Sequence, residues 1–296
     1  MAGENIRVGD LQIIALSDAT NPVELSAFFP DHGPEDWQDY PEYVDEAGAH
    51  REGVNLGSYL VVSDRQKLLV DTGIGPVPLE PFPDLSGNLV PTMREQCGYG
   101  PEDVDLVFAT HLHFDHIGWH VSRDEGGLRA TFPNARYVVP KVDWDSIFDP
   151  ELPKSGLHAD DYSQDAADVF HLSRPIVEDI MAVADAEVVS GGHSITDEVM
   201  TVDTPGHTPG HQSLLISSGT ERAFIVGDAF HLPVQLDVPE RLAGHDVHPK
   251  LGARTRRETI EWLEEQGLMT LIGHFPHPGF GHVLRGEGKR YWSALR

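Results

Sequence analysis

Apolar and polar residues alternate in short blocks along most of the chain, and this pattern predicts an α/β protein with many strands. Helices are expected at about 91–98 and at about 256–266. Thr255 and Glu258 form a capping-box pair at the start of the second helix, and Gly267 suits its C-terminal stop. The expected strands are 11–16, 58–62, 67–70, 105–109, 136–139, 187–189, 199–202, 213–216, 223–226 and 269–272.

Two segments depart from this pattern. Between about 143 and 184 the strand signals vanish and apolar residues recur at helical spacing, which predicts one to three helices laid over a sheet. The segment at about 20–55 is irregular and rich in proline, acidic and aromatic residues, so we expect a long surface excursion rather than a separate domain. All 296 residues are therefore expected to form a single domain.

The charge of the chain argues against several partners. It carries 21 Lys and Arg against 48 Asp and Glu, a net charge of −27 that would repel nucleic-acid backbones and anionic membranes. The apolar runs are too short to cross a bilayer. Cys97 is the single cysteine, so no internal disulfide can form, and the N-terminus shows no secretory signal. These features predict a cytoplasmic protein that binds neither nucleic acid nor membrane.

Histidine is unusually frequent, with 17 residues. Four side chains of the metal-binding kind follow the expected strand at 105–109 within six residues: His111, His113, Asp115 and His116. A turn at a strand end can point His111 and His113 toward one cation. Asp115 and His116, one turn further, can reach a second cation close by. Imidazole and carboxylate ligands suit Zn²⁺, and also Fe, Mn or Co.

Three further candidate ligands lie downstream: His207, Asp228 and His274. Each comes just past an expected strand, and strand ends gather at one edge in layered folds, so these side chains can join the first four. A solvated run of polar residues is the alternative interpretation of 111–116. That alternative explains neither the apolar strand before the run nor the three partners downstream.

With these motifs the chain resembles the metallo-β-lactamase superfamily of metal-dependent hydrolases. The resemblance runs from about 58 to 283 and rests on the pattern His-x-His-x-Asp-His followed by separated His, Asp and His. It implies an α/β fold (α+β in some schemes), a four-layer αββα sandwich with a dinuclear metal site between the sheets. It also implies a hydrolase in which a metal-bridging hydroxide attacks the substrate, with two divalent cations, Zn²⁺ first among them.

The resemblance also implies roles for single residues. His111, His113 and His207 would hold the first metal, Asp115, His116 and His274 the second, and Asp228 would bridge them. Asp71 would buttress the ligand loops from outside the coordination shell. Asp115 would in addition pass a proton to the leaving group. We expect His211 to orient the loop in which it lies.

The segment 204–215 resembles the acyl-homoserine lactonases of this superfamily. Those enzymes carry a tyrosine three residues after the bridging aspartate, where this chain has His231. The spacing Asp228-x-x-His231 and the tail at 274–283 resemble the methyl parathion hydrolase group, which accepts phosphotriesters and often lactones or aryl esters. We therefore expect opening of a small neutral lactone or carboxylic ester, with phosphotriester hydrolysis as the alternative. His231 could donate to the developing oxyanion or only hydrogen-bond a loop.

Substrate selectivity is expected to depend on the segments at 20–55 and 143–184. Phe28, Phe29 and Trp144 are candidates for an apolar pocket, and ordinary core or dimer contacts are the alternative for each. Acidic residues crowd both segments, which disfavours a polyanionic substrate and favours a neutral, partly apolar small molecule. A homodimer stays an open alternative to a monomer.

Other branches of the superfamily fit less well. Flavodiiron proteins carry a flavodoxin-like partner, for which this chain has no room. Many true β-lactamases are secreted and use a cysteine ligand, and Cys97 lies in the wrong place for one. The RNA-processing branch adds a domain or a clamping arm, and the net charge of −27 opposes RNA binding. A non-catalytic metal-binding scaffold generally loses ligands, whereas all seven are present here.

Overall fold

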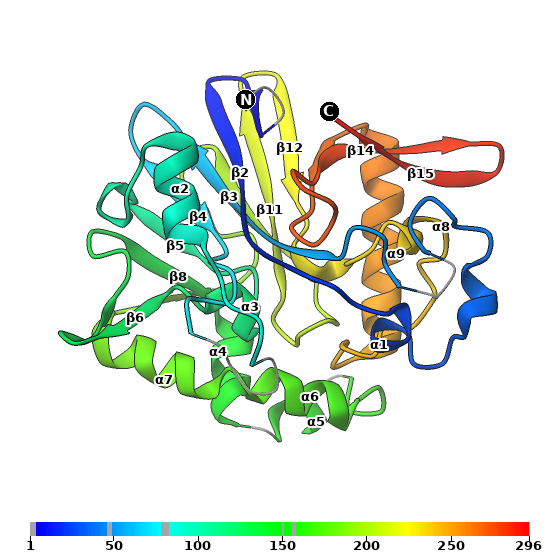
Figure 1. The fold of residues 1–296 in the computed structure, drawn as a ribbon, viewed down its shortest axis with the longest axis horizontal. Coiled ribbons are helices and arrows are strands. Elements are labelled where there is room, and N and C mark those ends of the chain that lie inside the picture. The colour runs from blue at the N-terminus through cyan, green and yellow to red at the C-terminus, as the bar shows by residue number, and fades with distance from the viewer. Residues whose placement is uncertain (1–3, 46–48, 78–82, 150, 156–157, 296) are drawn as a thin grey trace.

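The computed structural model describes residues 4–45, 49–77, 83–149, 151–155 and 158–295. Two β-sheets face each other at the centre of the molecule, and helices cover their outer faces (Figure 1). The chain up to residue 189 builds one sheet and forms the first half of the molecule, and the chain from residue 199 onward builds the other sheet and forms the second half. The four-layer αββα arrangement is therefore confirmed.

The first sheet combines antiparallel and parallel pairing. The strand order is β1-β2-β3-β4-β5-β8-β9, and the pairs from β4 through β5 and β8 to β9 are parallel. A separate hairpin joins β6 (Val121–Asp124) to β7 (Gly127–Ala130). The strands of the sheet are β1 (Asn5–Val8), β2 (Leu11–Asn21), β3 (Val54–Val62), β4 (Lys67–Val70), β5 (Leu106–Phe108), β8 (Arg136–Pro140) and β9 (Glu187–Val189).

The second sheet has the strand order β10-β11-β12-β13-β14-β15. Its pairs are antiparallel except for β12 with β13, which run parallel. The carboxyl ends of these two strands therefore reach the same edge of the sheet. The strands are β10 (Val199–Asp203), β11 (Gln212–Ser218), β12 (Glu221–Ile225), β13 (Met269–Leu271), β14 (Phe280–Gly286) and β15 (Lys289–Ala294).

Helices lie outside the sheets and in the loops that follow the strands. None of the described helices has both the length and the apolar character that a bilayer requires. The α-helices are α1 (Leu25–Phe28), α2 (Leu89–Cys97), α3 (Phe114–Ile117), α4 (Lys141–Phe148), α5 (Leu152–Ser155), α6 (Gln164–His171), α7 (Arg174–Val183), α8 (Val234–Asp237) and α9 (Pro249–Gln266), and the 3-10 helices are η1 (Pro34–Trp37), η2 (Pro101–Asp103) and η3 (Gly227–Ala229).

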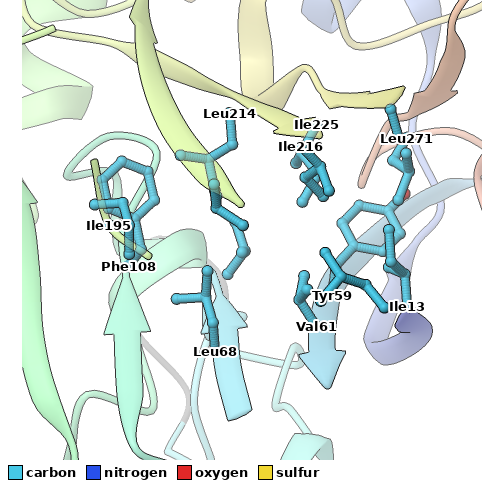
Figure 2. Close-up of a cluster of buried hydrophobic side chains, with 14 of the residues drawn as sticks. Ile13, Tyr59, Val61, Leu68, Phe108, Ile195, Leu214, Ile216, Ile225 and Leu271 are labelled. Atoms are coloured by element: carbon cyan, nitrogen blue, oxygen red, sulfur yellow. The ribbon is translucent and has the colours of Figure 1, made fainter. Parts of the chain in front are cut away.

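The main core lies between the two sheets. Figure 2 shows Leu68 and Phe108 of the first sheet facing Leu214 and Ile216 of the second. Successive residues of a strand point to opposite faces, so alternate apolar residues fill this core and the others pack under the outer helices. Leu69, for example, lies in the cluster beneath α2. Two rigid sheets packed in this way hold their carboxyl edges in fixed relative positions.

The last long helix differs from expectation at its start. α9 begins at Pro249, because proline is favoured in the first helical turn. Thr255 is consequently inside the helix, where its hydroxyl donates to the Pro205 carbonyl at 2.7 Å. The expected capping box with Glu258 is therefore wrong. The expected stop at Gly267 is confirmed, since this residue takes the left-handed conformation with φ 60°.

The segment at 143–184 holds more helices than expected. Its described residues form the four helices α4 to α7 rather than one to three. Pro175 in the first turn of α7 cannot continue the hydrogen-bond ladder of α6, so a new helix starts there. The second sheet is also larger than expected, because the hairpin of β14 and β15 follows the strand at 269–271 that was expected to be the last.

The segment at about 20–55 lies between two long strands, because β2 continues to Asn21 and β3 begins at Val54. Between them, Leu25, Phe29 and Trp37 pack with residues of the 232–243 loop in a small apolar cluster of their own. The segment therefore supports a loop of the second half of the molecule.

Candidate metal centre

The four candidate donors of the first motif lie where β5 ends. His113 has an extended backbone, with φ −72° and ψ 148°, and α3 begins immediately after it. Residues two apart in an extended stretch point to the same side, which accounts for the approach of the His111 and His113 rings. Their ring centroids are 4.8 Å apart. Asp115 and His116 lie in the short helix α3, which turns both side chains back toward the end of the strand.

Asp71 ties this motif to the neighbouring strand. It follows β4, which pairs in parallel with β5, so both strands end at the same edge. Its carboxylate accepts the Thr110 backbone N–H at 2.7 Å and the Thr110 hydroxyl at 2.9 Å. The same carboxylate lies 2.9 Å from Nδ1 of His116. Asp71 therefore contacts the ligand loop at three points, from outside the cluster of donors.

The other three candidate donors come from separate loops of the second half. His207 lies between β10 and β11, Asp228 lies in η3 directly after β12, and His274 follows β13. The parallel pairing of β12 with β13 brings Asp228 and His274 to one sheet edge. The Asp228 carboxylate oxygen Oδ2 is 2.9 Å from Nε2 of His274 and 3.3 Å from Nε2 of His116. The two halves of the molecule thus meet at the donors.

The donor atoms fall into overlapping groups. Nδ1 of His113 lies 2.9 Å from Nε2 of His111 and 2.8 Å from Nε2 of His207. Asp115, His116 and His274 form another group, and Asp228 joins His111 and His116 in a third. Within each group the donor atoms lie within 4.8 Å of one another. All seven residues expected to bind metal are brought together.

The hydrogen bonds of the outer ring nitrogens show that the groups fit cations. Nδ1 of His116 faces the Asp71 carboxylate, Nδ1 of His274 lies 2.8 Å from the Asn55 carbonyl, and Nδ1 of His207 lies 3.2 Å from the Asp246 carboxylate. These oxygens only accept, so each Nδ1 must donate.

The Nε2 atoms of these three rings point inward, toward the Asp228 carboxylate. Burial opposes charge on His116 and His274, but the Asp228 carboxylate outweighs it and raises the pKa of both rings, so positive charge is favoured where a cation would bind. The residues present therefore fit divalent metal ions.

Burial and charge set the protonation of the donors. Burial lowers the pKa of His113 to about 3 and the pKa of His207 well below its usual range, which keeps both rings neutral and able to bind metal. Burial opposes the charge of Asp228, but the nearby rings of His116 and His274 outweigh it and hold the pKa of Asp228 well below its usual range. Asp228 is therefore a carboxylate at the centre of the donor groups.

His211 supports Asp228 rather than joining the donors. Its Nδ1 lies 2.8 Å from the Thr204 hydroxyl, and its Nε2 accepts the Asp228 backbone N–H at 2.8 Å. Burial lowers the pKa of His211 to about 4, so the ring is neutral and Nε2 can accept. Gly227 must be glycine here, because its φ is 63° and a Cβ would lie 2.6 Å from Nε2 of His211.

Asp143 links the two ligand loops, and the sequence did not reveal this role. Its fully buried carboxylate accepts the Leu112 N–H at 3.2 Å, the Thr208 hydroxyl at 2.7 Å and the Gly210 N–H at 2.6 Å. Burial raises the pKa of Asp143 to about 6. Asp143 lies in α4, inside the segment expected to be a helical cover, and no motif marked it.

A cavity of about 180 Å³ opens onto the donors. Its walls are mostly apolar and come from both segments expected to govern selectivity, through Phe28 on one side and Leu172 on the other. Phe28 was an expected pocket residue. Phe29 is instead fully buried in the cluster with Trp37, and Trp144 packs against the ring of Phe148. The other lining residues are Asn21, Val23, Ala27, Val54, Leu56, Ile74, Leu85, His113, Phe114, Asp115, Val169, His207, Asp228, His231, His245 and His274.

Two histidines that are not among the seven donors line the same cavity. The ring of His231 stacks on that of His274 with centroids 5.8 Å apart, and its Nε2 is 3.4 Å from Asp228. Neither ring nitrogen of His231 makes a hydrogen bond to the described residues. His245, which the sequence had not singled out, lies beside Phe28 with ring centroids 5.1 Å apart. The cavity thus combines apolar walls with two imidazoles near the donors.

The chain belongs to the metallo-β-lactamase superfamily, whose family model matches residues 57–282. Fold, donor set and family together define a metal-dependent hydrolase. Among its relatives, the N-acyl homoserine lactonase AiiA of Bacillus thuringiensis subsp. kurstaki is 26% identical over 231 residues, which cover 73% of this chain and 79% of the relative. The N-acyl homoserine lactonase AttM of Agrobacterium fabrum is 32% identical over 120 residues, 40% of this chain and 38% of the relative.

Solved structures show the same fold. The hydrolase AbOPH of the β-lactamase superfamily matches with a TM-score of 0.82 and 26% identity, covering 100% of this chain and 98% of that chain. AidC, a dizinc quorum-quenching lactonase determined with the product N-hexanoyl-L-homoserine, matches with a TM-score of 0.82 and 20% identity, covering 99% and 97%. The resemblance found in the sequence is thus confirmed.

Proposed function

We propose that the protein opens a small neutral lactone of the acyl-homoserine-lactone type, or a carboxylic ester of similar size, with two divalent cations. The observation that carries the proposal is an apolar cavity whose lining includes donors from both groups, such as His113 and His274. Relatives and a structural neighbour named as lactonases support a lactone as the substrate.

The seven donors divide between the two cations. His111, His113 and His207 would hold one cation, Asp115, His116 and His274 would hold the other, and Asp228 lies where it could serve both. Zn²⁺ suits this mixture of imidazole and carboxylate, with Mn, Fe and Co as alternatives. When bound, such ions polarise a carbonyl oxygen and lower the pKa of a coordinated water to about 7.

Side chains in the cavity supply the rest of the chemistry. Hydrolysis joins a water oxygen to the carbonyl carbon, breaks the ring C–O bond and delivers one proton to the departing oxygen. Asp115 is suited to move that proton, because it lines the cavity and its side chain is 20% exposed, against 5% for Asp228. His231 is suited to donate a hydrogen bond to the carbonyl oxygen as negative charge develops there.

The walls favour an acyl chain on the substrate. Phe28, Val54 and Leu56 from one side and Val169 and Leu172 from the other offer apolar contact away from the donors. Apolar burial contributes about 0.8 kcal/mol per CH₂ group, so chain length should govern affinity. The net charge of −27 disfavours an anionic substrate.

Phosphotriester hydrolysis is the second candidate. His231, rather than a tyrosine, lies three residues after Asp228, and its unengaged ring faces the cavity. An imidazole there can donate to a phosphoryl oxygen as readily as to a carbonyl oxygen. The same apolar walls would accept the alkyl or aryl groups of a neutral phosphotriester.

A panel of rates separates the two candidates. kcat/KM is measured for N-acyl homoserine lactones of graded chain length, for γ- and δ-lactones, for an aryl ester, for a paraoxon-type triester and for a cephalosporin. Each rate is taken with Zn, Mn and Co, and Asp228→Ala gives the background. We expect the acylated lactones to be fastest and a shorter chain to raise KM. A triester turned over faster than every lactone would establish the second candidate instead.

A further inference from the structure

Arg256 is the largest fully buried side chain among the described residues, and it lies in α9, outside the second sheet. Its guanidinium is engaged on every side. Nε donates to the Ala229 carbonyl at 3.0 Å, and Nη1 donates to the carbonyls of Pro239 and Arg241 at 3.2 and 3.1 Å. Nη2 donates to Oδ2 of Asp246 at 2.8 Å. One side chain therefore fixes the loop from 229 to 246, which also carries His231 and His245.

The second oxygen of Asp246 faces a metal-binding side chain. Oδ1 lies 3.2 Å from Nδ1 of His207, whose Nε2 points to the His113 ring. The backbones on either side are hydrogen-bonded as well. The Val247 N–H donates to the His207 carbonyl at 2.9 Å, and the His248 N–H donates to the Gly206 carbonyl at 2.9 Å. Asp246 is thus in contact with Arg256 through one oxygen and with His207 through the other.

α9 packs in close contact with the loops that contain Asp246 and His207. A Cβ on Gly252, one turn before Arg256 in α9, would lie 2.7 Å from the Asp246 carboxylate. A Cβ on Gly206 would lie 2.3 Å from the Gly252 nitrogen. Glycine at both positions lets α9, Asp246 and the loop of His207 approach this closely.

A gain in stability alone does not explain why an ion pair is buried. Desolvation of both charges largely cancels their attraction, and apolar residues of similar size often serve stability equally well. The Arg256–Asp246 pair is fully buried, yet it leaves one carboxylate oxygen for an imidazole that points at the donor groups. A carboxylate held in this position fixes which ring nitrogen carries the proton and raises the basicity of the other.

We propose that Arg256 is a positioning residue for the metal centre: it holds Asp246, which keeps the proton on Nδ1 of His207 and the Nε2 lone pair directed at the cation. The proposal rests on metal binding and not on the lactone substrate. A protein that binds two cations but opens no lactone would overturn the substrate proposal and leave this one intact.

Zinc affinities test the proposal directly. The two binding steps are measured by chelator competition for the wild type, Asp246→Asn and Arg256→Lys, and the Co²⁺-loaded forms are compared by visible absorption. Asn can satisfy either His207 or Arg256 but not both, so we expect one of the two steps to weaken by roughly 10–100-fold and the other to change little. Lysine keeps the positive charge but cannot reproduce the several directed N–H donors of the guanidinium. The zinc affinity of Arg256→Lys should therefore lie between that of Asp246→Asn and that of the wild type.

A double variant shows what the ion pair contributes besides stability. Arg256→Met with Asp246→Leu removes the ion pair and leaves the carbonyls of Ala229, Pro239 and Arg241 without their donor, so the metal-free protein should unfold at a lower temperature than the wild type. It should also weaken the same zinc step and alter the Co²⁺ spectrum. A cross-link that only holds the fold would lower the unfolding temperature and leave that zinc step unchanged.

Asp18→Asn is the matched control. Asp18 is a buried carboxylate that accepts four hydrogen bonds, including the Leu89 N–H at 2.6 Å and the Trp119 Nε1–H at 2.8 Å, and none of them comes from a metal-binding side chain. This variant should lower the unfolding temperature and leave both zinc steps unchanged. The proposal is wrong if Asp246→Asn binds both ions as tightly as the wild type, or if its loss of affinity is shared by Asp18→Asn.

Discussion

The two halves of the molecule supply the candidate metal donors in different ways. The first half places four of them in one loop between His111 and His116, and the carboxylates of Asp71 and Asp143 brace that loop. The second half places three on separate loops, and the brace of His207 is the buried pair of Asp246 and Arg256.

The braces also cross between the halves. The Asn55 carbonyl of the first half faces Nδ1 of His274, and Asp143 of the first half binds the loop that follows His207. Neither half therefore holds a complete set of oriented donors. The site therefore forms only where the two halves meet. Substitutions of side chains that touch both halves should reduce metal binding and activity most.

The largest effect is expected for Asp228, whose carboxylate lies within 3.5 Å of His116, His207 and His274. Asp228→Ala should abolish turnover and remove both cations. His111→Ala should also abolish turnover but lower the metal content by less, because His111 lies 3.9 Å from that carboxylate and its ring nitrogen adjoins His113. Metal content per chain, measured by mass spectrometry, checks both. Two cations retained in Asp228→Ala would show that the halves bind metal independently.

A smaller effect is expected for His231, which contacts the donors from the second half only. His231→Ala should lower kcat by roughly 100-fold, the usual loss when one oxyanion donor is removed, and change KM little. His231→Gln keeps a donor and should recover part of kcat. Steady-state kinetics on the fastest lactone, with metal content measured in parallel, distinguish the cases. An unchanged kcat in the alanine variant would make His231 a scaffolding residue.

The smallest effect is expected for Asp143, which links the two ligand loops. Burial raises its pKa to about 6, from 3.8 in the unfolded chain, so the folded protein takes up a proton as the pH falls through this window. The free energy of unfolding of the wild type relative to Asp143→Asn should therefore rise by about 1 kcal/mol between pH 7 and pH 5. Urea unfolding of the metal-free proteins measures it. Parallel pH profiles for the two proteins would contradict the expectation.

Local patterns account for what could be anticipated. The strand that ends in Phe108 is an apolar block, and a polar run follows it in the sequence. The four donors of that run lie within six residues of one another. His207, Asp228 and His274 could be added because each follows an apolar block. The αββα arrangement and the superfamily followed from these motifs.

Elements without such a local signal were missed. The hairpin of β14 and β15 carries charged residues at Arg285, Lys289 and Arg290, which hide its strand character. α9 starts earlier than the capping pattern at Thr255 indicated, because the loop that contains Asp246 packs against its first turns.

The sequence by itself determined the two-sheet fold, the superfamily and which seven side chains gather as donors, because these depend on short patterns of apolar and metal-binding residues. Only the tertiary structure decided that Phe28 rather than Phe29 reaches the cavity, and that Asp143 and Arg256 brace the ligand loops. Those contacts join residues far apart in the chain, and a single aspartate or arginine in a sequence does not reveal what it will face once the sheets have packed.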